Sequence, residues 1–281
     1  MIISMVYFSG TGNTERITQE LGALFSRSGH EVKLIAVETV VHDNAVITEL
    51  SESDLIGIGY PVYDLREPKI ISDFIDMLPV QETEVPVFQY STLALIKGDC
   101  HSYVTRKLGS GNYYVIADTG FKCPSNGVVT YEAPDHWRQK KVGYAKNIGL
   151  QLNDFRTKVL ESYEKFITAP YSVHAYIFPV FDIFRFFSRR LFGDRFYRDL
   201  AVSEKCNACG LCVKSCPDKN LCLKDARVEI KKSNGCLRCL RCVSMCPRQA
   251  ITFTSSNLKR QYTKEIRDRL FEEAVNPNCV R

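Results

Sequence analysis

Two cysteine runs with identical spacing constrain this 281-residue chain more than any other feature. They read Cys206-Asn-Ala-Cys209-Gly-Leu-Cys212-Val-Lys-Ser-Cys216-Pro217 and, further along the chain, Cys236-Leu-Arg-Cys239-Leu-Arg-Cys242-Val-Ser-Met-Cys246-Pro247. Two residues between successive thiols form a tight turn that points the sulfurs toward neighbouring corners of a small cube. Proline closes each run because its ring fixes φ and removes a donor. Thiolates are soft ligands that suit iron–sulfur clusters, so the pattern predicts two [4Fe–4S] clusters.

The C-x2-C-x2-C-x3-C-P spacing resembles that of the two-cluster ferredoxins of anaerobic bacteria, over residues 200–255. In that family the fourth cysteine of each run binds the other run's cluster. The resemblance implies that Cys206, Cys209, Cys212 and Cys246 hold one cluster, and that Cys236, Cys239, Cys242 and Cys216 hold the second. Zinc is the alternative, but zinc usually takes two separated C-x2-C pairs, which fit these runs poorly. We expect the nearby Cys222 to be a small buried side chain and not a ligand.

The N-terminus carries a second pattern, an apolar stretch at 2–8 followed by Ser9-Gly10-Thr11-Gly12-Asn13-Thr14 and a helical pattern over 15–28. Backbone N–H groups at a helix N-terminus attract anions, and glycines let the backbone approach a phosphate closely. The run is neither a P-loop nor a G-x-G-x-x-G dinucleotide loop. Its hydroxyls and its lack of a cation suit a phosphate monoester held without a neutralising lysine. The alternative is an ordinary strand–helix turn with a threonine cap.

Apolar stretches at 31–37, 54–60, 85–91 and 112–119 alternate with helical patterns at 68–78, 101–108 and 134–167, which predicts an α/β fold with a parallel sheet. The loop at 9–14 resembles the FMN-phosphate loop of flavodoxins, over residues 1–165. The resemblance implies a doubly wound five-stranded sheet of order 2-1-3-4-5, with FMN at the carboxyl ends of its strands. The implied FMN contacts are Ser9, Gly10, Thr11, Gly12, Asn13, Thr14, Tyr60, Pro61, Val62, Tyr63, Tyr90, Ser91 and Thr92. Tyr63 is expected either to stack on the flavin or to close a surface turn.

Charge and composition narrow the class further. Residues 1–165 carry 16 Lys and Arg against 21 Asp and Glu, whereas residues 166–281 carry 21 against 11. Anionic clusters offset part of that positive charge, so we expect no nucleic acid as a partner. Reduced thiols predict a cytoplasmic protein. The connector at 166–199 is aromatic-rich and is expected to pack on a domain or, through 171–198, to contact a membrane surface. Residues 256–281 are expected to form a helical tail.

Together the two halves resemble the flavodoxin–ferredoxin fusion proteins of anaerobic bacteria and archaea. The resemblance implies an electron-transfer protein that passes electrons between FMN and two [4Fe–4S] clusters and converts one- and two-electron steps. A separate redox protein is the expected partner. Two alternatives stay open, an FMN-dependent reductase of a small acceptor and a redox-sensing binding module. No Ser-His-Asp arrangement is recognisable in the sequence, and no catalytic residue is expected.

Overall fold

The computed structural model describes residues 1–40, 45–63, 65–94, 96–125, 144–168, 200–231, 236–253 and 261–275. Its N-terminal half contains a parallel sheet of five strands in the order β2-β1-β3-β4-β5. The strands are β1 (Ile2–Tyr7), β2 (Glu31–Ala36), β3 (Leu55–Pro61), β4 (Val85–Leu93) and β5 (Tyr113–Lys122). The expected fold class, a doubly wound flavodoxin-like sheet, is confirmed by this order.

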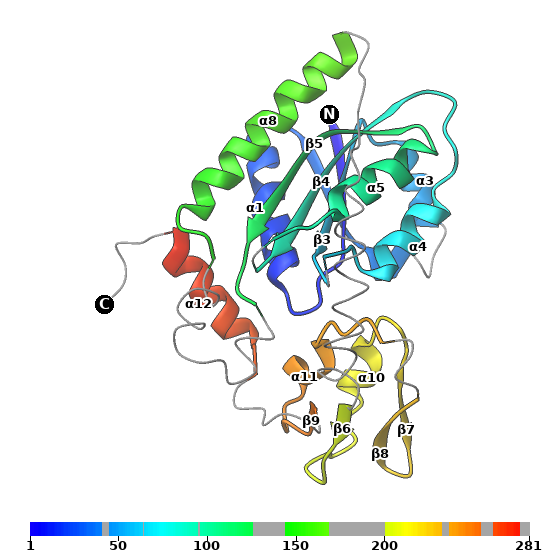
Figure 1. Ribbon diagram of the computed structural model, residues 1–281, viewed down its shortest axis with the longest axis vertical. Coiled ribbons are helices and arrows are strands. Elements are labelled where there is room, and N and C mark those ends of the chain that lie inside the picture. Colours follow the sequence, from blue (N-terminus) through cyan, green and yellow to red (C-terminus); the bar gives the residue numbers. More distant parts are fainter. Residues whose placement is uncertain are drawn as a thin grey trace.

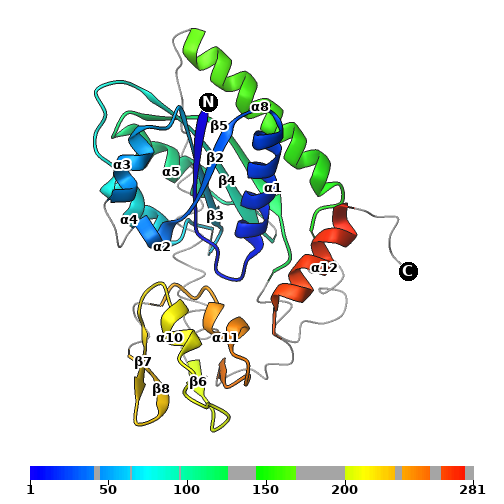
Figure 2. The ribbon, with the colours of Figure 1, turned by 180° about the vertical axis from the view of Figure 1, so that it is seen from behind.

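Helices cover both faces of the sheet (Figures 1 and 2). One face carries α1 (Asn13–Arg27) and α8 (Ile148–Thr168), and the other carries α2 (Val37–Val40), α3 (Ala45–Ser51), α4 (Lys69–Met77) and α5 (Cys100–Gly109). Each face has its own core, with Phe25, Phe88 and Phe155 in the first and Tyr60, Phe74 and Val104 in the second. Buried on both faces, β3 is apolar along nearly its whole length, as parallel strands usually are.

The sequence prediction of a helix from 134 to 167 is wrong at its start. Residues 144–147 are not helical, and α8 begins at Ile148. Asn147 precedes it with φ of 65°, a left-handed conformation that asparagine tolerates, and its carbonyl accepts the first helical hydrogen bond from Gln151. Residues 134–143 of that prediction lie outside the described part of the chain.

The cysteine-rich half lies beyond the carboxyl ends of the parallel strands (Figure 1). It contains two short antiparallel sheets, β6 (Leu200–Val202) with β9 (Ile251–Phe253) and β7 (Leu221–Lys224) with β8 (Arg227–Ile230). Two five-residue helices follow the cysteine turns, α10 (Leu211–Ser215) and α11 (Arg241–Met245). The buried residues of the cysteine-rich half form a separate small core that includes Cys212, Leu221 and Val243.

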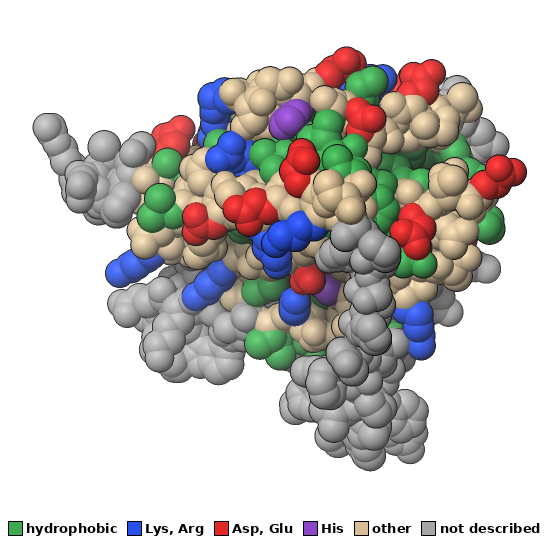
Figure 3. Space-filling model, turned by 90° about the horizontal axis from the view of Figure 1, so that it is seen from above, with side chains coloured by type: hydrophobic (Ala, Val, Ile, Leu, Met, Phe, Trp, Pro, Cys, Tyr) green, Lys and Arg blue, Asp and Glu red, His purple; other side chains and the backbone are tan. Residues whose placement is uncertain are grey.

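The last helix, α12 (Lys264–Val275), returns to the N-terminal half and lies near the lower end of α8 (Figure 2). Residues 169–199, which make up nearly all of the predicted connector and include its proposed membrane contact, lie outside the described residues. None of the described helices has the length and apolar character needed to cross a membrane. At the opposite end of the molecule from the cysteine-rich half, acidic and basic side chains are interspersed (Figure 3).

Candidate functional site

The loop after β1 has the backbone geometry of an anion cradle. Gly12 caps the N-terminus of α1 with φ of 98°, a left-handed conformation that favours glycine. Its N–H donates to Ser9 Oγ at 3.1 Å, which folds the loop back on itself. Thr14 Oγ1 lies 2.8 Å from Thr92 Oγ1, so the loop is joined to the carboxyl end of β4. The structure therefore brings the loop and Thr92 together, as a flavin site between these strands requires.

Gly10 lies where a side chain has no room. A Cβ added there would lie 2.3 Å from Tyr63 Oη and 2.7 Å from the carbonyl oxygen of Cys239. Tyr63 thus leans over the loop, with its neighbour Val62 bonded through N–H to the carbonyl of Thr92. The crowding explains why this position is glycine, and it shows that the cysteine-rich half touches the loop directly.

Three of the expected flavin contacts have side chains that belong to the two cores. Tyr60 is fully buried and donates to Gln89 Oε1 at 2.7 Å, and Tyr90 is fully buried with its hydroxyl 2.6 Å from Thr18 Oγ1. Ser91 is also fully buried. Any contact between these three residues and a flavin would go through the backbone at the strand ends, where Tyr60 pairs with Ser91.

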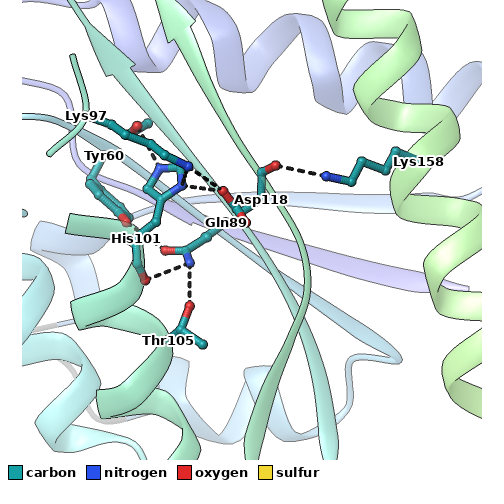
Figure 4. Close-up of polar contacts among 8 residues, drawn as sticks. Tyr60, Gln89, Lys97, His101, Thr105, Asp118 and Lys158 are labelled. Atoms are coloured by element: carbon teal, nitrogen blue, oxygen red, sulfur yellow. Dashed lines mark hydrogen bonds and ion pairs between the residues drawn. The ribbon is translucent and has the colours of Figure 1, made fainter. Parts of the chain in front are cut away.

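Ser91, His101 and Asp118 form an arrangement that the sequence analysis missed, and Figure 4 shows His101 facing Asp118. His101 Nε2 lies 2.8 Å from Ser91 Oγ, and Nδ1 lies 2.6 Å from Asp118 Oδ1, which Lys97 also contacts at 3.0 Å. The arrangement resembles a hydrolytic triad in connectivity, but the serine hydroxyl has no exposed surface for a substrate to reach. No local sequence signal links these residues, because the register of β4 and β5 and the packing of α5 on the sheet place them side by side.

Burial lowers the pKa of His101 and keeps its imidazole neutral, although Asp118 opposes that effect. The neutral ring then donates a hydrogen bond from Nδ1 to Asp118 and accepts one at Nε2 from the Ser91 hydroxyl. The hydrogen bond from His101, with Lys97 nearby, holds the pKa of Asp118 well below its usual range. Gln89 extends the network by donating to the His101 carbonyl at 3.0 Å. These bonds brace the ends of β4 and β5 behind the loop.

We expect His101→Gln to lower stability at neutral pH by about 1–3 kcal/mol, because buried hydrogen-bonding groups lose their partners. Acid should also destabilise the wild type more than the variant. Below about pH 6.5 the unfolded chain protonates this histidine while the folded chain does not, so stability falls with pH. Thermal unfolding at pH 7.5 and 5.5 measures both effects. His30→Gln, at a less buried histidine, is the control, and equal acid sensitivity of His101→Gln and wild type would contradict the assignment.

The two cysteine runs share one backbone conformation. Residues with positive φ recur at matched positions, with Ala208, Gly210 and Lys219 in the first run and Arg238, Leu240 and Gln249 in the second, at φ between 49° and 75°. Such values cost non-glycine residues about 1–3 kcal/mol each and concentrate at functional sites. Alternating left- and right-handed residues turn successive N–H groups inward and form the concave anion sites typical of iron–sulfur proteins. The repeated loop therefore fits an anionic cluster.

One pocket is lined by four of the eight cysteines, namely Cys216, Cys236, Cys239 and Cys242. This is the set that the ferredoxin resemblance assigns to the second cluster, including the cysteine contributed by the other run. Cys212 lies close enough to Cys246 and Cys209 for their charges to raise its pKa, after the larger effect of its own burial. Cys209, Cys212 and Cys246 all belong to the set that the resemblance assigns to the first cluster.

The thiols themselves are suited to bound metal. Burial raises the pKa of Cys239 to about 12 and also raises the pKa of Cys236 and Cys242. Such thiols ionise only beside a strong positive charge such as bound iron. Backbone N–H groups already point at three sulfurs, from Asn220 to Cys216 Sγ at 3.3 Å, from Arg238 to Cys236 Sγ at 3.4 Å and from Ala250 to Cys246 Sγ at 3.2 Å. Hydrogen bonds of this kind tune cluster potentials.

A single zinc ion would need these sulfurs closer together than the structure places them. A tetrahedral zinc ion holds four sulfurs at about 2.3 Å from a single point. Across the part of the chain that the structure describes, no three Cys, His, Asp or Glu side chains converge enough to hold one metal ion. A cubane instead takes each thiolate at a separate corner.

Cys222 is partly exposed on β7 and lies outside the four-cysteine pocket, so our expectation that it is buried is wrong.

Arg241 joins the two halves. Its guanidinium donates to the carbonyls of Ser9 at 2.7 Å and Gly10 at 3.3 Å, and it pairs with the Glu38 carboxylate. It also donates to the Ser215 carbonyl at 3.0 Å. Arg241 thus ties the turn between Cys239 and Cys242 to the phosphate loop. The loop at 9–14 has no cation in its own sequence, and Arg241 contacts it from the cysteine-rich half.

Comparisons with solved structures find flavodoxins. Those of Megasphaera elsdenii, of the domain Archaea and of Bacillus cereus share 21%, 16% and 16% identity, with TM-scores of 0.37, 0.41 and 0.41. The matches cover 42%, 59% and 57% of this chain and 84%, 98% and 99% of those chains. No family model matches the chain, and a search of curated proteins finds no match. We therefore argue function from the residues of this chain.

Proposed function

We propose that the protein is an electron-transfer protein that binds FMN at the carboxyl ends of β1, β3 and β4 and two [4Fe–4S] clusters in the cysteine runs. The observation that carries this proposal is the direct contact between the two sites. Cys239, which lines the four-cysteine pocket, has its carbonyl oxygen against Gly10 of the phosphate loop. Two cofactors held this close suit electron transfer between a one-electron cluster and a flavin that accepts one or two electrons.

The FMN site would use the residues that surround the loop. Backbone N–H groups of residues 9–14 would face the phosphate, and Tyr63 together with the end of β4 would border the flavin ring. The second cluster would be held by Cys216, Cys236, Cys239 and Cys242, next to this loop. The first would be held by Cys206, Cys209, Cys212 and Cys246. Cys209 is exposed, so a partner redox protein would approach on this side.

Cofactor content tests the proposal. The full-length protein, purified without oxygen, should contain about one FMN and about eight irons per chain, with matching inorganic sulfide. Zinc in place of iron would refute the cluster assignment, and iron without any flavin would refute the flavin assignment. The two parts of the proposal are therefore separable in one preparation.

Arg241→Ala should loosen the contact between the halves, because a half-buried guanidinium that bonds two loop carbonyls and a carboxylate is lost. Amide hydrogen exchange in residues 9–14 and 236–242 should accelerate at least about tenfold. Leu211→Ala is the matched control, since Leu211 occupies the equivalent position in the first run and is 44% exposed. Unchanged exchange in Arg241→Ala would show that this residue does not hold the halves together.

A further inference from the structure

The C-terminal helix α12 is built into the N-terminal half. Phe271 is 2% exposed, lies in the same core as α1 and α8, and meets the Tyr144 ring edge-on at 5.1 Å. The Arg16 guanidinium of α1 lies 4.6 Å from the Phe271 ring centre. Because these contacts bury the apolar side of α12, its position relative to the phosphate loop is defined by packing.

This packing places Arg267 on the phosphate loop. A Cβ on Gly12 would lie 1.7 Å from Arg267 Nη1 and 2.8 Å from Cζ, so the guanidinium occupies the space that the glycine leaves. The Arg267 side chain is 8% exposed. Its nearest carboxylates are Glu15, at 3.6 Å from Nη1, and Asp268, at 2.9 Å from Nε.

The Arg267 guanidinium is a cation at the N-terminus of α1, a place that is unfavourable for a cation unless an anion binds there too. The first turn of α1 already carries the positive end of the helix dipole, where cations are disfavoured and anions favoured. A second positive charge, largely removed from water, adds to that cost. Asp268 pairs with Nε at 2.9 Å, whereas Glu15 is 40% exposed and its oxygen lies 3.6 Å from Nη1, beyond hydrogen-bond distance. The end of the guanidinium nearest the loop is therefore the less compensated one. An anion between the loop and the guanidinium would satisfy both.

The side chain of Asn13 in the loop is already hydrogen-bonded to residues outside the loop. Tyr262 Oη donates to Asn13 Oδ1 at 2.6 Å, Tyr144 Oη donates to it at 3.0 Å, and Asn13 Nδ2 donates to the Pro124 carbonyl at 2.9 Å. The Asn13 side chain is thus engaged behind the loop. From the C-terminal segment, Tyr262 hydrogen-bonds the one amide side chain of the loop, and Arg267 places its guanidinium against the loop.

We propose that Arg267 is a phosphate-binding residue, so that the C-terminal helix completes the FMN site and selects FMN over riboflavin. The inference rests on the proposed function, because it takes the loop to be the FMN-phosphate site. A guanidinium offers a planar pair of N–H donors that matches two phosphate oxygens, and hydrogen bonds between charged groups are about twice as strong as neutral ones.

The test compares Arg267→Gln, Arg267→Lys and Arg269→Gln in the full-length protein after its flavin has been removed. Arg269 lies on the same helix, is 59% exposed and pairs with Glu273, so it controls for changes in α12 itself. Quenching of flavin fluorescence gives Kd for FMN and for riboflavin separately. Arg267→Gln should weaken FMN binding about 10- to 100-fold and leave riboflavin binding within about twofold, since only FMN carries the phosphate.

Arg267→Lys keeps the charge without the paired donors, and we expect a loss of FMN affinity between those of wild type and Arg267→Gln. It also keeps the test decisive if Arg267→Gln fails to fold. Equal weakening of FMN and riboflavin, or no weakening of FMN in either variant, would overturn the role of Arg267. A wild-type protein that binds neither flavin would instead overturn the proposed function, so the two failures are distinguishable.

Discussion

The double variant Cys216→Ala/Cys242→Ala should retain about four of about eight irons, whereas Cys212→Ala/Cys242→Ala should retain almost none. Cys216 and Cys242 come from different runs but line the same pocket, so removing both disables a single cluster. Cys212 lies by Cys209 and Cys246, so pairing its loss with that of Cys242 disables both clusters. Iron and sulfide analysis of anaerobically purified protein measures the difference.

Cys222→Ala is the control for this pair of variants. Its sulfur lies 3.9 Å from the Glu229 carbonyl on the neighbouring strand and outside the four-cysteine pocket, so about eight irons should remain. If each run instead held its own cluster, Cys216→Ala/Cys242→Ala would lose nearly all its iron. That outcome would contradict the crosswise assignment while leaving the number of clusters intact.

Gly10→Val should release FMN and separate the two halves in one step. The new Cβ would lie 2.7 Å from the Cys239 carbonyl, a backbone atom that cannot swing aside, and 2.3 Å from Tyr63 Oη. Moving the Cys239 backbone costs about 1–3 kcal/mol, so FMN affinity should fall about 10- to 100-fold. Equilibrium dialysis against FMN measures this loss, and hydrogen exchange of residues 236–242 reports the separation.

Gly109→Val is the matched control, because no atom lies within 4 Å of the Cβ position at Gly109, at the end of α5. It introduces the same side chain away from the site and should leave FMN affinity within about twofold. Wild-type affinity in Gly10→Val would mean that the loop is not where the phosphate binds.

The sequence was informative wherever the chemistry depends on neighbouring residues. Strands alternating with helices predicted a parallel sheet, because parallel strands need crossover helices, and the resemblance to flavodoxins supplied the strand order. The resemblance of the cysteine spacing to that of two-cluster ferredoxins predicted which four thiols line one pocket. The loop at 9–14 was also recognisable from neighbouring residues, because Gly12 adopts a conformation that other residues avoid.

What the sequence could not predict depends on contacts between distant residues. Arg241 and Arg267 reach the loop at 9–14 from more than two hundred residues away, and the cysteine motif that contains Arg241 leaves the identity of that residue open. Ser91, His101 and Asp118 meet only because the registers of β4 and β5 and the position of α5 bring them together. Tertiary packing decides such contacts, and no local pattern records it.

Electron transfer within one chain tests the central claim most directly. The oxidised protein is mixed rapidly, without oxygen, with a one-electron donor, and the bleaching of the clusters and of the flavin is followed by absorbance. Because the Cys239 turn touches the phosphate loop, flavin reduction should follow cluster reduction with a rate independent of protein concentration. A flavin that stays oxidised, or is reduced at a rate proportional to protein concentration, would contradict the account.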